Sequence, residues 1–138
     1  MTREKMNKPR GLKNNNPLNI RKNNTKWQGL AEVQKDKAFF TFVAPEWGYR
    51  AALRTLQNYN RVHRLGTIRE WIYRWAPPCE NPTENYLNFV CQKVEMPADA
   101  CPRISNKKIM CDIVAAMSHF ENGVPAVMGD VCKGWELL

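Results

Sequence analysis

Acid–base chemistry in this sequence rests on thirteen carboxylates and two histidines. The motifs of other common chemistries are absent from it, since it has no Walker loop, no G-x-S-x-G and no H-E-x-x-H. Its five widely spaced cysteines form no C-x-x-C pair, so we expect no metal site and no cofactor. We expect these cysteines to be reduced, and one disulfide formed after release from the cytosol is the alternative. The question is therefore which carboxylate lies in an environment that tunes it.

One predicted helix, over 107–122, singles out Glu121. At 100° per residue, Glu121 lies within about 40° of the apolar stripe of that helix, so we expect it to be partly buried. The last turn is also the negative end of the helix dipole, and both effects disfavour the anion and favour a general acid. The alternative is a frayed helix end that exposes Glu121 as an ordinary polar residue. The stripe is formed by Met110, Val114 and Met117.

Two other acids are candidates for a second group at such a site. Glu32 lies on or beside a predicted hairpin, and a hairpin lip opposite a helix terminus is a common way to form a groove. We therefore predict Glu32 as the second carboxylate, with a solvated strand residue as the alternative. Glu80 lies in a loop, where it could face a cleft. Glu46, the rival of Glu121, falls in a first helical turn, where the dipole stabilises its charge and favours a structural role.

These side chains depend on a mostly helical scaffold. Residues 14–21 are rich in side chains that bond their own backbone, which predicts a structured loop. The runs 26–34 and 38–43 have β-type composition and hairpin spacing, so we predict one small hairpin near the N-terminus. From Pro45 onward the spacing of apolar residues is helical. Caps and breakers predict helices over 45–65, 68–75, from the cap at Asn81 to before Pro97, 107–122 and 126–135.

The composition limits the class of protein. With 138 residues and 43% hydrophobic residues, the chain suits a single domain, which we place at 14–138 after a flexible basic segment at 1–13. Its apolar stretches are too short for a membrane span and its start lacks the apolar region of a secretory signal, so we expect no membrane insertion. The formal net charge of +8 predicts attraction to polyanions: nucleic acid, an anionic membrane surface or a charged cell-wall polymer.

Six blocks of the sequence carry a resemblance to known proteins. They are Asn14 to Arg21, Trp27-Gln28-Gly29, Phe40-Thr41-Phe42, Pro45 to Ala51, Arg74 to Tyr86 and His119-Phe120-Glu121-Asn122-Gly123. Together they resemble a phage and prophage family often labelled structural protein P5, and the resemblance extends over nearly the whole chain. Leu18 stands where that family usually shows glycine, and Cys79 and Phe120 replace commoner polar residues.

The order of these blocks is also similar to that of glucosaminidases of the flagellar and autolysin type, which have a lysozyme-like fold. In those enzymes a helix ending in the catalytic glutamate comes first, and an Asn-rich loop, a Trp-x-Gly hairpin and an aromatic helix follow. Here the glutamate helix comes last, so the resemblance implies a circularly permuted lysozyme-like domain. Such a domain should pack the 14–21 loop beside the C-terminal end of the Glu121 helix.

The resemblance also implies roles for individual residues. Glu121 takes the position of the catalytic acid, Tyr86 that of a cleft tyrosine, and Glu32 falls in a hairpin region where a second acid is sometimes found. The large aromatic residues belong to the core by default, although one or two could line a groove, since aromatic faces pack well against sugar rings. The predicted substrate-binding residues are Tyr86, Asn15, Asn16, Asn19, Trp27 and Glu80.

The leading hypothesis is an endolysin-like peptidoglycan glycosidase of a bacteriophage, a monomer in which Glu121 protonates the glycosidic oxygen. The attacking group and the choice between hydrolase and lytic transglycosylase stay open. Synthesis in the host cytoplasm, followed by holin-type release or incorporation into the virion, would bring it to the wall. A non-enzymatic virion protein that holds glycan or coat protein is the alternative. A nucleic-acid-binding module is a third hypothesis, and we expect no specific nucleic-acid partner because no binding motif accompanies its arginines.

Overall fold

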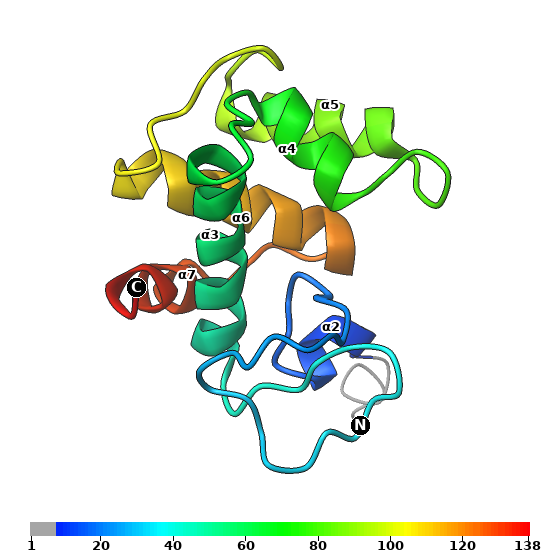
Figure 1. Cartoon of the computed structure of the whole chain (residues 1–138). Coiled ribbons are helices and arrows are strands. Elements are labelled where there is room, and N and C mark those ends of the chain that lie inside the picture. The colour runs from blue at the N-terminus through cyan, green and yellow to red at the C-terminus, as the bar shows by residue number, and fades with distance from the viewer. Residues whose placement is uncertain (1–7) are drawn as a thin grey trace.

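A mainly helical chain is seen in the computed structural model, which describes residues 8–138 (Figure 1). The prediction of a mainly helical single domain is thereby confirmed. Within the described range the helices are α2 (Arg10–Lys13), α3 (Pro45–Arg61), α4 (Ile68–Trp75), α5 (Thr83–Val94), α6 (Lys107–Asn122) and α7 (Met128–Glu136).

Local sequence signals account for most helix ends. The Thr67 side chain accepts a hydrogen bond from the backbone of Glu70, whose carboxylate reaches back, so that a capping box begins α4. Gly123 ends α6 with a φ of 73°, a left-handed conformation that glycine adopts at little cost. α3 ends at Arg61, earlier than predicted, because the chain then turns through Arg64, whose φ of 58° is incompatible with a continuing helix.

The core lies where α3 crosses α6, with α4 and α5 at one end and α7 beside α3 (Figure 1). Leu18 is fully buried in this core, so the leucine in the 14–21 loop serves packing. A smaller cluster of Phe40, Phe42 and Ala51 lies under the loops at the other end. Fully buried side chains of the main core include Leu53, Leu56, Trp71, Ile72, Met110 and Met117.

The predicted small β-hairpin is wrong. The two runs do face each other, since Ala31 N donates to Thr41 O at 2.9 Å and Val43 N donates to Gly29 O at 2.8 Å. Within the described residues, however, β pairing is limited to the isolated bridges Arg21↔Phe39 and Leu30↔Phe42. Hydrogen bonds from side chains take the place of a strand ladder. Gln34 Nε2 donates to Thr41 O and Gln34 Oε1 accepts from Thr41 N, at 2.8 Å each. Asn16 Nδ2 donates to Phe40 O at 2.9 Å.

A flexible segment is predicted over residues 1–13. Residues 1–7 of that segment lie outside the described part of the chain. Residues 10–13 form α2, where Gly11 is buried. None of the described helices is long and apolar enough to cross a membrane. Among residues 8–138, no three His, Cys, Asp or Glu side chains gather as a metal ion would require.

Candidate active site

Glu121 lies in the last turn of α6 and is half-buried. It lines a cleft of about 650 Å³ formed by the 18–27 segment, α3 and the turn after α4. The stripe residues Met110, Val114 and Met117 have no exposed surface, so the predicted orientation of Glu121 on the buried side of its helix is confirmed. A carboxylate is thus presented at the boundary between core and cleft.

Three side chains from three other segments donate hydrogen bonds to the Glu121 carboxylate. Asn19 Nδ2, from the 14–21 loop, lies 2.9 Å from Oε1. Tyr86 Oη, from α5, lies 2.9 Å from Oε2, and Trp75 Nε1, from the end of α4, lies 3.3 Å from the same oxygen. These contacts span 102, 35 and 46 residues of sequence respectively, so the tertiary fold holds this carboxylate in one place.

Tyr86 is the buried one of the three donors to Glu121. Its side chain is 3% exposed and its ring packs on Phe120 with the centroids 4.4 Å apart. Burial, together with the nearby Glu121 carboxylate, raises the pKa of Tyr86 well above its usual value. The hydroxyl therefore stays protonated at neutral pH and can act as a donor to Glu121.

The asparagines of the 14–21 loop suit its backbone conformation and hold it in place. Asn15 and Asn19 have φ values of 52° and 53°, in the left-handed region that asparagine tolerates better than most residues. Asn16 is fully buried, donates to Ile20 O at 3.0 Å and accepts from Ile20 N at 2.9 Å. The loop is therefore fixed by its own side chains, and it turns Asn19 toward Glu121.

The 14–21 loop packs against the C-terminal end of α6, as the permutation hypothesis requires. Asn122 Nδ2 donates to Pro17 O at 2.8 Å, one residue beyond the contact between Asn19 and Glu121. Gly11 closes this junction, because a Cβ atom at this position would lie 2.7 Å from Asn19 Oδ1 and 2.9 Å from Asn122 Oδ1. The expected proximity of these two segments is confirmed.

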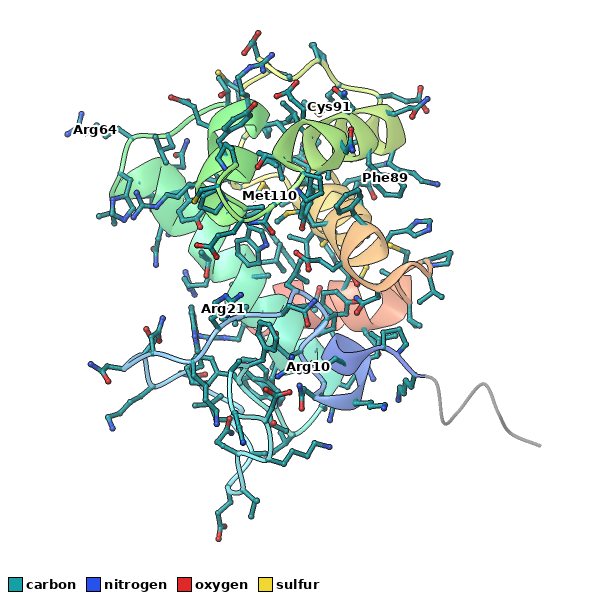
Figure 2. The ribbon with its side chains drawn as sticks, turned by 90° about the vertical axis from the view of Figure 1, so that its right-hand side faces the viewer. Arg10, Arg21, Arg64, Phe89, Cys91 and Met110 are labelled. Atoms are coloured by element: carbon teal, nitrogen blue, oxygen red, sulfur yellow. The ribbon has the colours of Figure 1, made fainter. Side chains whose placement is uncertain are left out.

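The cleft combines aromatic faces with amide and hydroxyl groups. Trp27, Phe39, Tyr59 and Trp75 supply the aromatic part of its lining. Polar groups come from the 19–25 segment, α3 and the turn after α4, and the exposed Arg21 adds a positive charge (Figure 2). The polar lining includes Asn19, Asn23, Thr25, Thr55, Asn58, His63, Glu80 and Asn81.

The structure brings most of the predicted site residues together. Asn19, Trp27 and Glu80 line the same cleft as Glu121, and Tyr86 contacts Glu121 directly. Three predicted residues lie elsewhere. Glu32 is exposed and outside the cleft lining, because the hairpin that was to carry it does not form. Asn15 and Asn16 bind backbone carbonyls of the folded loops, so their role in this structure is to hold the 14–21 loop.

Sequence reasoning missed Trp75 as a site residue. Its indole N–H donates to Glu121, although the helical pattern placed Trp75 in the core by default. The signal that could have found it is its position directly before Ala76-Pro77-Pro78, where α4 ends and the chain enters the cleft wall. A large aromatic residue at a helix end next to a loop is well placed to face both the core and a groove.

Comparison with known proteins gives one informative relative. No protein-family model matches the chain. Protein P5 of Pseudoalteromonas phage PM2 is 39% identical to it over 131 residues, which cover 92% of this chain and 80% of the phage protein. The name P5 describes no activity. At this identity and coverage, the chain belongs to the family of phage P5 proteins.

Proposed function

We propose that this protein is a glycosidase that cuts the glycan strands of peptidoglycan, with Glu121 as the proton donor to the glycosidic oxygen. The observation that carries the proposal is the Glu121 carboxylate, which faces an open cleft and is held by three donors from three separate segments. Such preorganisation supports catalysis by a carboxyl group, because a misplaced proton donor loses much of its effect.

The two carboxylate oxygens of Glu121 have unequal surroundings. Oε2 accepts hydrogen bonds from both Trp75 and Tyr86, which occupy its two lone pairs. Oε1 accepts one bond, from Asn19, and keeps its second lone pair for a proton. Oε1 is therefore the oxygen that delivers the proton to the glycosidic oxygen, and that recovers a proton when the second half of the reaction needs a base.

The chemistry of the cleft suits an amino-sugar polymer. Trp27, Tyr59 and Trp75 offer flat apolar faces on which pyranose rings can pack, and the neighbouring amide side chains offer partners for hydroxyl and acetamido groups. The formal net charge of +8 attracts the protein to an anionic wall. These features favour peptidoglycan over a neutral glycan as the substrate.

The group that attacks the sugar depends on which other carboxylates reach the cleft. Glu80 lines it, but lies on the exposed turn after α4, and among the described residues no hydrogen-bond donor positions its side chain. We propose that cleavage does not depend on Glu80 and that the acetamido or 6-hydroxyl group of the substrate itself attacks. The first route ends in hydrolysis and the second in an anhydro sugar, as in a lytic transglycosylase.

A circularly permuted lysozyme-like fold is part of the same proposal. The contact of the 14–21 loop with the end of α6 supports it, because this junction is continuous in the unpermuted enzymes that the sequence resembles. Membership of a phage protein family supports action on the wall of an infected bacterium. We propose that the protein is made in the host cytoplasm and acts as a monomer, after holin-type release or within the virion.

Digestion of purified sacculi tests the activity. The parent protein should release muropeptides, and mass spectrometry of the new sugar ends distinguishes reducing from anhydro products. Glu121→Gln keeps the shape of the side chain but cannot donate the proton, so cleavage should fall by roughly 10²- to 10⁴-fold. Glu46→Gln is the matched control, because Glu46 lies in the first turn of α3 outside the cleft lining. Glu80→Gln should retain activity.

Two results would contradict the proposal. Full activity of Glu121→Gln would mean that another group donates the proton. A parent protein that binds sacculi and releases no fragments would instead support the alternative, a virion protein that holds glycan without cutting it.

A further inference from the structure

α6 and α7 pack against each other in opposite directions. Figure 1 shows the chain turning back after α6, so that the end of α7 lies near the start of α6. An ion pair marks the register of the two helices, since Lys107 Nζ lies 2.7 Å from Glu136 Oε2. Cys111 lies one turn after Lys107 on α6, and Cys132 lies one turn before Glu136 on α7. The antiparallel register therefore places these two cysteines opposite each other.

Cys132 is one of the groups that raise the pKa of the Cys111 thiol, as expected for two thiols at the same level of this interface. Cys111 is 3% exposed, and its burial raises the pKa of its thiol to about 11, with the adjacent Cys132 adding to the rise. Cys132 is half-buried and can be reached from solvent. The other cysteines belong to different parts of the fold: Cys79 to the turn after α4, Cys91 to α5 and Cys101 to the α5–α6 connection.

We propose that Cys111 and Cys132 form an intramolecular disulfide when the protein passes from a reducing to an oxidising compartment. The ring closed by this bond, residues 111–132, contains most of α6 with Glu121, the turn into α7 and the first part of α7. The bond therefore fastens the segment that carries Glu121 to a helix that also packs on α3. It restricts the unfolded chain and so stabilises the folded state.

Glutathione disulfide, or a protein disulfide of the same class, supplies the oxidant. The Cys132 thiolate attacks one sulfur of glutathione disulfide, which forms a mixed disulfide and releases one glutathione thiolate. The Cys111 thiolate then attacks Cys132 Sγ and expels the second glutathione thiolate. In total, two cysteine thiols lose two protons and two electrons, and one glutathione disulfide becomes two glutathione thiols.

The test compares the full chain in reducing buffer and in a glutathione redox buffer that contains excess disulfide. Alkylation followed by intact mass should count five free thiols in the reduced protein and three, five minus the bonded two, in the oxidised monomer. Peptide mapping should find the link between Cys111 and Cys132. The melting temperature of the oxidised protein should be higher by roughly 10 °C.

Variants identify the pair responsible for the shift. Cys132→Ala and Cys111→Ala should each abolish the rise in melting temperature on oxidation. If Cys111→Ala destabilises the fold because Cys111 is buried, Cys132→Ala at the half-buried position still tests the proposal. Cys79→Ser and Cys101→Ser are matched controls at exposed cysteines and should keep the rise. Five free thiols in the oxidised monomer, a link between other cysteines, or a disulfide-bonded dimer would each overturn the proposal. None of these measurements depends on glycan cleavage.

Discussion

The contact between Tyr86 and Glu121 allows a quantitative test of the candidate site. Tyr86→Phe removes one hydroxyl that donates to the Glu121 carboxylate at 2.9 Å and leaves the ring in its place on Phe120. A hydrogen bond to a charged group contributes roughly 1.5 to 3 kcal/mol, and part of this is offset because the buried hydroxyl no longer has to be desolvated. We therefore expect the variant to lose about 1 to 2 kcal/mol in its free energy of unfolding at pH 7.

The same contact predicts how this loss depends on pH. The pKa of Tyr86 is raised in the folded protein, so its contribution to stability is fully present below the unfolded value of about 10 and is lost as the pH rises above it. The parent should lose stability above pH 10 more steeply than Tyr86→Phe does. The difference between the two proteins should shrink by up to about 1.4 kcal/mol per pH unit there.

Urea unfolding followed by tryptophan fluorescence, between pH 7 and pH 11, measures both effects. Tyr73→Phe is the matched control, because the Tyr73 hydroxyl also donates to a carboxylate, that of Glu84, but at the surface. Its loss at pH 7 should be smaller, since solvent replaces the hydroxyl. A Tyr86→Phe protein as stable as the parent at pH 7, or a difference that stays constant up to pH 11, would refute the assigned role of this hydroxyl.

Two other perturbations test the loops that hold the site. Gly11→Ala gains helix propensity of about 1 kcal/mol, but its Cβ would lie 2.7 Å from Asn19 Oδ1, so we expect a melting temperature several degrees below that of the parent. Hydrogen bonding from Arg10 holds the pKa of Asp36 far below its usual value, so the stability that Asp36 contributes is present above about pH 4 and is lost as the pH falls. Acid titration by circular dichroism should therefore show a steeper loss between pH 4 and pH 2 in the parent than in Asp36→Asn.

The helices could be predicted from the sequence because their determinants are local. The capping box at Thr67, the cap at Asn106 and the glycine at 123 each act within one turn, and α4 and α6 have the predicted bounds. The absence of the hairpin could not be predicted, because strand pairing over these residues depends on side chains that are distant in the sequence. Residues 38–43 have β-type composition, yet the asparagines of the 14–21 loop occupy several of their backbone groups. Competition from polar side chains of another segment is invisible to a pattern read along one strand.

In the candidate site, too, features fixed within one helix could be predicted, and contacts between segments could not. Periodicity placed Glu121 on the buried side of α6, because the angle between residues on one helix is fixed by its geometry. It could not identify the donors, because Asn19, Trp75 and Tyr86 come from other segments whose packing is set by the whole core. The resemblance to known enzymes places Tyr86 at the site, whereas Trp75 has no comparable signal and its helical spacing predicts a core position.

The failure of Glu32 follows from the failure of the hairpin, and it changes the chemistry that the site can offer. A second carboxylate was expected on a rigid lip opposite Glu121, where either direct attack or activation of water would be possible. The chain at this place is an irregular loop, and Glu32 lies exposed outside the cleft. Glu80 lines the cleft, but it lies on an exposed turn. A single firmly held carboxyl can still serve as acid and then as base, provided that the substrate supplies the nucleophile, and the products released from sacculi would reveal that requirement directly.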